Sequence, residues 1–171
     1  MATSLLILGG ARSGKSRFAI AGVRAEARVA FVATAEPADA DMAARIARHQ
    51  AERPGGWRTV EEPVDLVARL QEIRAVDRVI VDCVTVWVAN LMLRGDGEEA
   101  IVKAGEGLAA FVARSGVDIT IVSNEVGEGV HPSTEDGRRF RDALGAVNQR
   151  LAAACDRVVL MVAGLPLAIK P

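Results

Sequence analysis

The segment from Gly9 to Ser16 contains residue types at a spacing that can bind a triphosphate. It reads GGARSGKS and fits the P-loop pattern G-x-x-x-x-G-K-[ST]. Glycines permit a tight turn whose backbone N–H groups point at phosphate oxygens, and the helix that follows adds the positive end of its dipole. We therefore predict that Lys15 contacts the β- and γ-phosphates of a nucleotide and that the Ser16 hydroxyl binds Mg²⁺. A chance match is expected in roughly one chain of this size in two hundred, so a glycine turn without a ligand is the weaker interpretation.

Asp82 ends an apolar segment that is typical of a second component of such sites. Residues 78–82 read RVIVD, an apolar strand that terminates in a carboxylate. In P-loop proteins a carboxylate at this position completes the Mg²⁺ coordination shell, directly or through water. The alternatives are a helix N-cap and an ordinary surface acid. Together with the P-loop, the pattern predicts a magnesium site made by Ser16 and Asp82.

His49 is the candidate nucleophile. The chain has two histidines, and His49 lies on a helix predicted over residues 38–52, at the border between its apolar and charged faces. Arg45 precedes it by one turn, and a nearby guanidinium disfavours the imidazolium, so the ring is expected to be neutral and nucleophilic near neutral pH. A partly exposed helical histidine without a chemical role is the alternative. The other histidine, His131, is interpreted as a loop residue.

The composition predicts one compact domain over residues 1–171. Half of the residues are apolar and a quarter are charged, which excludes disorder as the overall state. Twenty-one basic and twenty-two acidic side chains leave a formal net charge of −1, so no broad positive field favours a nucleic-acid partner. Apolar runs stay below the roughly 18 residues of a membrane span, and residues 1–8 lack the features of a signal peptide, so we expect a cytoplasmic protein. Cys83 and Cys155 show no metal-ligand spacing and are expected to be buried thiols.

Short apolar segments alternate with helical patterns along the chain. The apolar runs are rich in β-branched residues and lack polar–apolar alternation, as the buried strands of a parallel sheet require. We predict strands at residues 4–8, 29–33, 78–81, 119–122 and 158–162, helices at 15–27, 38–52, 63–75, 98–115 and 133–153, the last with Ser133 as N-cap, and surface loops at 53–56 and 95–97. The alternation predicts an α/β fold, P-loop NTPase-like, with a mostly parallel central sheet and helices on both faces.

Further motifs, in their order along the chain, resemble those of one enzyme family. Besides the P-loop and His49, they are TAE (34–36), RP (53–54), WRT (57–59), Glu61, DCVT (82–85), SNEVG (123–127) and AGLPL (163–167). On these motifs the chain is similar to the bifunctional adenosylcobinamide kinase/adenosylcobinamide-phosphate guanylyltransferases of cobalamin biosynthesis. The resemblance covers almost the whole chain, and only the P-loop is common outside that family.

The resemblance implies two reactions and a covalent intermediate. It implies that the enzyme phosphorylates the aminopropanol hydroxyl of adenosylcobinamide with ATP or GTP. GMP then passes from GTP to His49 and on to adenosylcobinamide phosphate, which gives adenosylcobinamide-GDP. The implied partner is a small-molecule corinoid, the implied metal is Mg²⁺, and the implied assembly is a homo-oligomer, with a trimer as one option. By position, the implied nucleotide contacts are Gly9, Gly10, Ala11, Arg12, Ser13, Gly14, Lys15, Ser16, Thr34, Ala35, Glu36, Gln50, Ala51, Glu52, Arg53 and Glu61.

Some features keep other interpretations open. After SNEVG the chain continues EGVHPST, where many family members have Pro-Asn, so the loop on the corinoid side differs in detail. Asn124 and Glu125 follow a strand, where ligand sites of α/β proteins cluster, yet they could equally be capping or turn residues. Arg138, Arg139 and Arg141 are either a solvated helix face or phosphate contacts. A small-molecule P-loop kinase without a covalent intermediate is the alternative function; a GTPase-like switch has less support because the chain lacks an N-K-x-D guanine motif.

Overall fold

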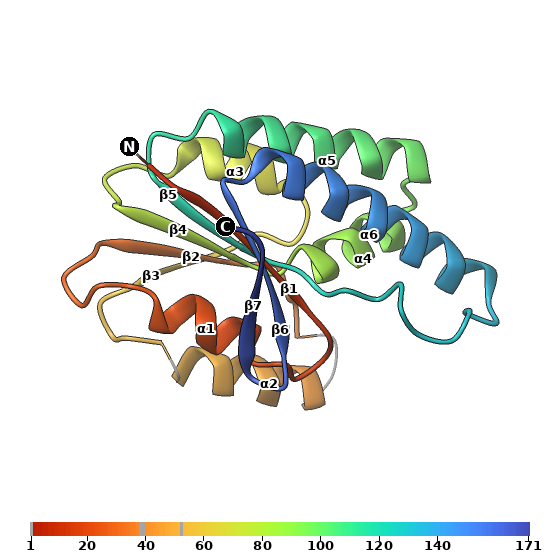
Figure 1. The fold of residues 1–171 in the computed structure, drawn as a ribbon, viewed down its shortest axis with the longest axis horizontal. Coiled ribbons are helices and arrows are strands. Elements are labelled where there is room, and N and C mark those ends of the chain that lie inside the picture. Colours follow the sequence, from red (N-terminus) through yellow and green to blue (C-terminus); the bar gives the residue numbers. More distant parts are fainter. Residues whose placement is uncertain (1, 38–39, 52) are drawn as a thin grey trace.

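The computed structural model describes residues 2–37, 40–51 and 53–171, and of helix residues 41, 42, 45 and 49 it describes the backbone alone. Within these residues, seven strands form one sheet in the order β3-β2-β4-β5-β1-β6-β7 (Figure 1). The strands are β1 (Ser4–Gly9), β2 (Val29–Ala33), β3 (Arg58–Glu61), β4 (Arg78–Asp82), β5 (Asp118–Val122), β6 (Arg157–Val162) and β7 (Leu165–Lys170). Neighbouring strands pair in parallel, except that β7 runs antiparallel to β6. This architecture confirms the predicted P-loop NTPase-like α/β fold.

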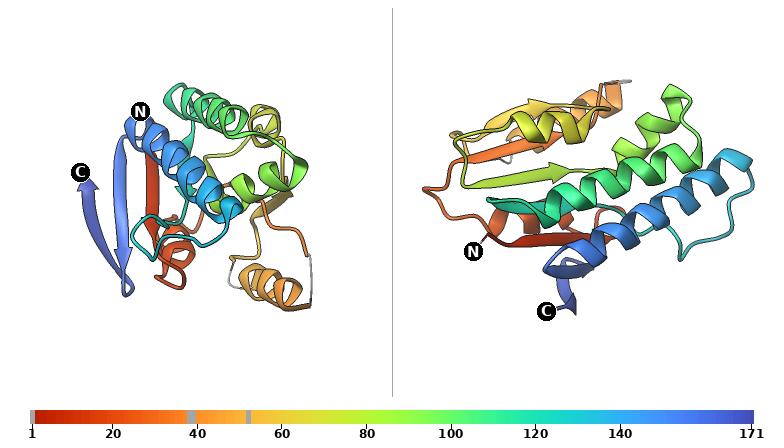
Figure 2. Two further views of the ribbon diagram at one scale, coloured as in Figure 1. Left: turned by 90° about the vertical axis from the view of Figure 1, so that its right-hand side faces the viewer. Right: turned by 90° about the horizontal axis from the view of Figure 1, so that it is seen from above.

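Helices cover both faces of the sheet, unequally. They are α1 (Lys15–Ala21), α2 (Ala40–Ala51), α3 (Leu66–Glu72), α4 (Val84–Arg94), α5 (Glu98–Ala113) and α6 (Glu135–Ala154). Figure 1 shows α3, α4, α5 and α6 on one side of the sheet and α1 and α2 on the other. In the left view of Figure 2, α2 stands apart from the sheet. The helix that carries His49 is therefore the one placed outside the main layers.

Two hydrophobic cores, one on each side of the sheet, account for the apolar strands. The larger core joins side chains of β1, β2, β4 and β5 to buried residues of the helical layer such as Trp87 and Leu144. The smaller core gathers Ile7, Phe31 and Ile80 from the strands beneath Ala19 of α1. Because the central strands bury both faces, they show no polar alternation. The same burial holds the carboxyl ends of β1, β4 and β5 in fixed positions.

The predicted helix ends need correction in several places. The first helix ends at Ala21 rather than Ala27, because Gly22 follows and its N–H caps the helix. Residues 63–75 contain a shorter helix, Leu66–Glu72. The N-cap of α6 is Thr134, not Ser133, since the Thr134 hydroxyl accepts a 3.1 Å hydrogen bond from the Gly137 N–H. Of the predicted helix at 38–52, residues 38, 39 and 52 lie outside the described residues.

Three elements escaped the sequence patterns. The helix α4 reads VTVWVANLMLR, a continuous apolar run that periodicity cannot distinguish from a buried strand. The strand β3 is a polar edge strand with one buried residue, Val60. The strand β7 contains Pro166, which a central strand would not tolerate, but it occupies the edge of the sheet. Ala163 and Gly164, both with positive φ, form the tight turn that pairs β7 with β6.

Gly105 is the close-contact point between α5 and α6. A Cβ there would lie 2.7 Å from Cγ2 of Val147, a fully buried β-branched side chain with little freedom to turn away. We expect Gly105→Ala to lower the free energy of unfolding by about 1–3 kcal/mol because it overpacks the core. Gly107→Ala, on the same helix where a Cβ meets nothing within 4 Å, is the matched control and should raise it by up to about 1 kcal/mol. Urea unfolding measures both; equal stability of the two variants would contradict the contact.

The described residues also bear on two compositional predictions. In the part of the chain that the structure describes, every helix is too short or too polar to span a bilayer. Cys155 is buried and Cys83 is half-buried, and both are free thiols. Burial raises the pKa of Cys83 to about 11 and the pKa of Cys155 to about 12. Both thiols are therefore poor nucleophiles near neutral pH, and Cys83 is less buried than expected from the sequence.

Candidate active site

The GGARSGKS segment lies between β1 and α1, where a phosphate-binding loop must lie. Gly14 adopts φ 94° at the N-cap of α1, and the Ser13 N–H donates a 3.3 Å hydrogen bond to the Gly10 carbonyl. Gly9 has φ 150°, and a Cβ on it would lie 2.7 Å from both the Met161 carbonyl oxygen and the Ser13 hydroxyl. Only glycine fits this position. The tight turn predicted from the sequence is therefore present, with the tip of the loop exposed.

Lys15 is buried beneath the loop with its ammonium group turned toward the loop carbonyls. Its Nζ donates hydrogen bonds to the carbonyl oxygens of Gly9 (2.9 Å) and Gly10 (2.6 Å), and it lies 3.5 Å from the Ser13 hydroxyl. Burial lowers the pKa of Lys15, while nearby Cys83 and Asp82 act in the opposite direction. A buried cation at the mouth of an amide-lined turn is suited to bind phosphate.

Strand register aligns three residues at the carboxyl edge of the sheet. Asp82 of β4 lies opposite Ala33 of β2, and Ala33 lies opposite Glu61 of β3. Residues in register on neighbouring parallel strands point to the same face, which is the face that carries α1. Asp82 is half-buried and Glu61 is exposed. Both carboxylates therefore face the side of the sheet that carries α1, the helix that begins at Lys15.

Thr34 connects the ends of β2 and β4. Its hydroxyl donates to the Cys83 carbonyl at 2.8 Å and accepts from the Cys83 N–H at 2.9 Å, and its N–H donates to the Asp82 carbonyl at 3.2 Å. The Asn90 amide donates to the Thr34 carbonyl at 2.8 Å. The predicted contact residue Thr34 thus positions the backbone next to Asp82, whereas Ala35 and Glu36 continue outward with greater exposure.

The donor set fits Mg²⁺ bound together with a nucleotide. Ser16 stands half-buried in the first turn of α1, and Asp82 ends the strand β4. A hydroxyl and a carboxylate are hard oxygen ligands, and Mg²⁺ keeps several waters and phosphate oxygens in its shell. Among the described residues, no three His, Cys, Asp or Glu side chains gather to form a metal cage by themselves. Ser16 and Asp82 would hold the ion, and the nucleotide would supply the remaining negative charge.

Arg53 follows α2 and is held against the sheet by aromatic side chains. Its guanidinium carbon lies 3.6 Å from the centroid of the Phe31 ring, and Phe31 stacks on Trp57 with centroids 6.5 Å apart. Its Nη1 donates to the Thr59 hydroxyl at 3.2 Å, and its buried Nε has no hydrogen-bond partner among the described residues. Burial lowers the pKa of Arg53, whereas Asp82 and, to a smaller extent, Glu61 act to raise it. The structure therefore brings the predicted contact residue Arg53 to the edge that carries both carboxylates.

The candidate nucleophile lies on α2. His49 is a residue of that helix, and Gln50 and Ala51, which follow it, are exposed. The side chains of His49 and Arg45 lie outside the described part of the structure, as does the whole of Glu52. Figure 1 places α2 on the same side of the sheet as α1. The backbone of His49 therefore lies on the same side of the sheet as α1, the helix that follows the phosphate-binding loop.

A buried polar cluster was not predicted from the sequence. Ser123, which follows β5 and has no exposed surface, donates a 2.7 Å hydrogen bond to Oδ1 of Asn148 on α6. The Asn148 amide donates to the Asn124 carbonyl at 3.0 Å, and the Asn124 N–H donates to the Thr85 hydroxyl of α4 at 2.7 Å. These side chains come from separate elements, so no local pattern could have indicated that they meet. They fix the backbone that leaves the carboxyl end of β5.

The arginines of α6 serve neighbouring protein groups. Arg138 donates to the carbonyls of Pro132 and Ser133, Arg139 pairs with Asp136, and Arg141 contacts Asp142 and His131. These contacts favour the interpretation as a partly solvated helix face. His131 is a loop residue, as predicted.

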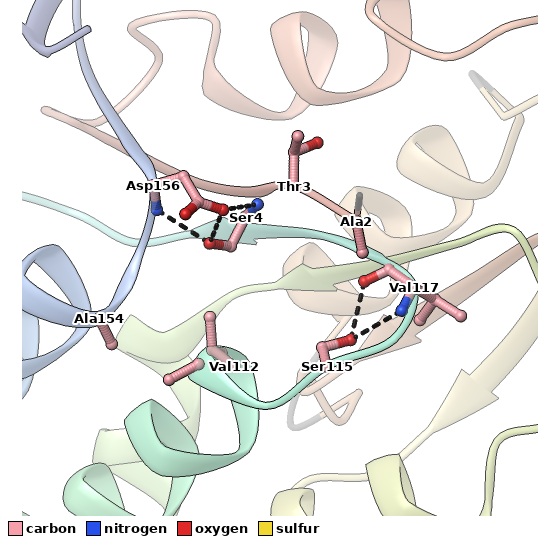
Figure 3. Close-up of a pocket in the computed structure, with 9 residues that line it drawn as sticks. Ala2, Thr3, Ser4, Val112, Ser115, Val117, Ala154 and Asp156 are labelled. Atoms are coloured by element: carbon pink, nitrogen blue, oxygen red, sulfur yellow. Dashed lines mark hydrogen bonds between the residues drawn. The ribbon is translucent and has the colours of Figure 1, made fainter.

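Two cavities lie at the amino ends of the strands, away from the phosphate-binding loop. The one in Figure 3 has a volume of about 150 Å³, and its polar groups are paired, as Ser4 and Asp156 are through 2.7–2.9 Å hydrogen bonds. The second, of about 510 Å³, is bounded by residues near the starts of β2, β3 and β4. Parallel α/β sheets bind ligands at the opposite, carboxyl edge. The loop edge is therefore the candidate active site.

Comparison with known proteins gives consistent matches. The model of the family described as cobinamide kinase/cobinamide phosphate guanyltransferase matches residues 5–169. The bifunctional adenosylcobalamin biosynthesis protein CobP of Pseudomonas aeruginosa is 46% identical over 96% of each chain. The CobU proteins of Escherichia coli and Salmonella typhimurium, which carry the same description, are 39% and 38% identical over 97% of this chain and 99% of their own length. Among solved structures, an ATPase from the type III secretion system of pathogenic bacteria superposes with a TM-score of 0.57 at 10% identity, over 97% of this chain and 56% of that one, a likeness of fold alone.

Proposed function

This chain belongs to the cobinamide kinase/cobinamide phosphate guanyltransferase family, and we propose that its two reactions are linked through a guanylylated His49. As a member of that family it is a bifunctional transferase of cobalamin biosynthesis. In the proposal it phosphorylates adenosylcobinamide with ATP or GTP, and GMP from GTP then passes through His49 to adenosylcobinamide phosphate to give adenosylcobinamide-GDP. The observation that carries the proposal is the phosphate-binding turn with Lys15 buried beneath it and the Asp82 carboxylate nearby.

The nucleotide is proposed to bind along the carboxyl edge of the sheet. The loop amides surround its phosphates, Lys15 contacts the β- and γ-phosphates, and Ser16 with Asp82 holds Mg²⁺, which when bound offsets phosphate charge. Arg53, held in place by Phe31, adds a positive charge on the same edge. The proposed contacts are Gly9, Gly10, Ala11, Arg12, Ser13, Gly14, Lys15, Ser16, Thr34, Ala35, Glu36, Gln50, Ala51, Glu52, Arg53 and Glu61.

The guanylyl transfer is proposed to take place in two displacements at the α-phosphorus. A neutral ring nitrogen of His49 forms a bond to the α-phosphorus of GTP, and the bond to the α–β bridging oxygen breaks, which releases pyrophosphate. A phosphate oxygen of adenosylcobinamide phosphate then attacks the same phosphorus, and the N–P bond breaks to regenerate the imidazole. The high-energy N–P bond makes the second displacement favourable. Lys15 stabilises the charge that develops on the leaving pyrophosphate.

Labelled GTP tests the covalent intermediate. We expect the wild-type protein, incubated with GTP labelled at the α-phosphorus and then denatured, to retain a label that is acid-labile and alkali-stable, as a phosphoramidate is. The label should map to the tryptic peptide that begins at His49, and GTP labelled at the γ-phosphorus should leave none. A kinase without a covalent intermediate would retain label from neither, and that result would contradict the proposal. The single domain over residues 1–171, the homo-oligomer and the cytoplasmic location stay predictions.

A further inference from the structure

Glu125 lies directly beside Lys15. The Gly9 carbonyl oxygen accepts a 3.1 Å hydrogen bond from the Glu125 N–H and a 2.9 Å hydrogen bond from the Lys15 ammonium. Two donors that share one acceptor atom are close neighbours. The loop after β5 therefore touches the first glycine of the phosphate-binding turn at the point where Lys15 is anchored. The SNEVG motif (123–127), which has no role in the nucleotide site proposed above, therefore contacts the phosphate-binding turn.

Strand order places Glu125 between the two halves of the nucleotide site. β5 lies between β4, which ends in Asp82, and β1, which leads into Gly9. Val122, the last residue of β5, is in register with Asp82 on one side and with Ile7 on the other. Glu125 follows only three residues later. The loop that carries Glu125 therefore leaves the sheet between the strand that leads to the phosphate-binding turn and the strand that ends in Asp82.

The backbone on which Glu125 sits is fixed from three sides. The cluster of Ser123, Asn148 and Thr85 uses both the N–H and the carbonyl of Asn124, and the Glu125 N–H is bonded to Gly9. Fully hydrogen-bonded buried clusters of this kind hold a site rigidly. The chain thus uses three buried polar side chains to hold one loop residue against the phosphate-binding turn.

A backbone hydrogen bond holds one oxygen of the Glu125 carboxylate, and the other oxygen has no partner among the described residues. Its Oε1 accepts a 2.8 Å hydrogen bond from the Gly127 N–H, and the side chain is half-buried. Among the described residues, no arginine or lysine forms a salt bridge with this carboxylate, and Oε2 has no hydrogen-bond partner. One oxygen therefore anchors the group, and the other can accept a proton.

We propose that Glu125 is the catalytic base of the kinase reaction, contacting the acceptor hydroxyl of the cobinamide. This inference rests on the proposed function. The hydroxyl oxygen forms a bond to the γ-phosphorus, the bond from that phosphorus to the β–γ bridging oxygen breaks, and the nucleoside diphosphate leaves with the electron pair. The hydroxyl proton passes to the Glu125 carboxylate and then to solvent. A residue that orients the attacking hydroxyl and takes its proton is a recurrent component of phosphoryl transfer.

Glu125→Gln tests this role because glutamine keeps an oxygen for the Gly127 N–H but cannot take the proton. With adenosylcobinamide and ATP, we expect the kinase kcat to fall about 10²–10³-fold, with the KM for ATP changed by less than about threefold. With adenosylcobinamide phosphate and GTP, which bypass the kinase step, product formation should change by less than about twofold. The kinase kcat of Glu125→Asp should be at least about tenfold higher than that of Glu125→Gln. Glu128→Gln, on the exposed part of the same loop, is the matched control and should behave as the wild type.

Two results would overturn the inference. One is a kinase kcat of Glu125→Gln within about threefold of the wild type, and the other is an equal loss of both reactions, which would indicate a purely structural residue. Circular dichroism melting of each variant separates the second result from simple unfolding. If the wild-type protein retains no label from GTP, the proposed intermediate at His49 is wrong. The kinase assay with ATP alone then still tests the role of Glu125.

Discussion

Replacement of His49 by alanine is expected to reduce the protein-bound label from α-labelled GTP below detection. The label requires a nucleophile that forms a bond to the α-phosphorus, and an imidazole nitrogen does so without first losing a proton when it is neutral. The two cysteines are poor substitutes, because burial raises the pKa of Cys83 to about 11 and that of Cys155 to about 12. The expected loss is thus more than about 10³-fold, in line with removal of a covalent catalyst.

The chain provides a matched control for this experiment. Its only other histidine, His131, is exposed on the loop before α6, where its Nδ1 lies 2.8 Å from Arg141 Nη1. His131→Ala should retain the full label. If His49→Ala retains the label, or if only His131→Ala loses it, the nucleophile is another residue and the assignment to His49 is wrong. Phosphoramidate chemistry in either variant is checked by its loss in acid and its survival in alkali.

Replacement of Lys15 by alanine is expected to lower both reactions by about 10³-fold or more. Both use a nucleoside triphosphate bound in the same turn, and the ammonium stabilises the charge that accumulates on the phosphate groups in each transition state. Initial rates of the kinase reaction and of guanylylation measure the effect. Lys103→Ala, an exposed lysine on α5, is the control. Unaltered activity of Lys15→Ala in either reaction would show that this reaction does not use the P-loop.

Loss of activity in Lys15→Ala should not come from loss of folding. Burial lowers the pKa of Lys15, which means that the folded state disfavours its charged form. Removal of this ammonium therefore relieves a desolvation cost, although it leaves the Gly9 and Gly10 carbonyls without one donor. We expect the melting temperature of the variant without nucleotide to stay close to that of the wild type. Residues that bind charge at active sites often reduce stability in this way.

Local patterns were sufficient for most of the sheet and for the phosphate-binding turn. The strands β1, β2, β4, β5 and β6 were predicted within a residue or two, because each buries both faces and its residues are continuously apolar. The turn was predicted because its chemistry depends on consecutive residues, the glycines and Lys15. By contrast, α4 and the edge strands β3 and β7 were missed. Burial of an apolar helix and the edge position of a strand depend on neighbours distant in the sequence.

By itself the amino-acid sequence determined the α/β class, the position of the P-loop, the acid at the end of β4 and the family to which the chain belongs. These features depend on residues close together in the chain, whose backbone requirements and burial are reflected in residue type and period. Only the tertiary structure decided that Glu125 shares the Gly9 carbonyl with Lys15, and that Arg53 rests on Phe31. These contacts depend on the order of the strands in the sheet. Strand order results from packing of the whole sheet against its helices, and no local stretch of sequence encodes it.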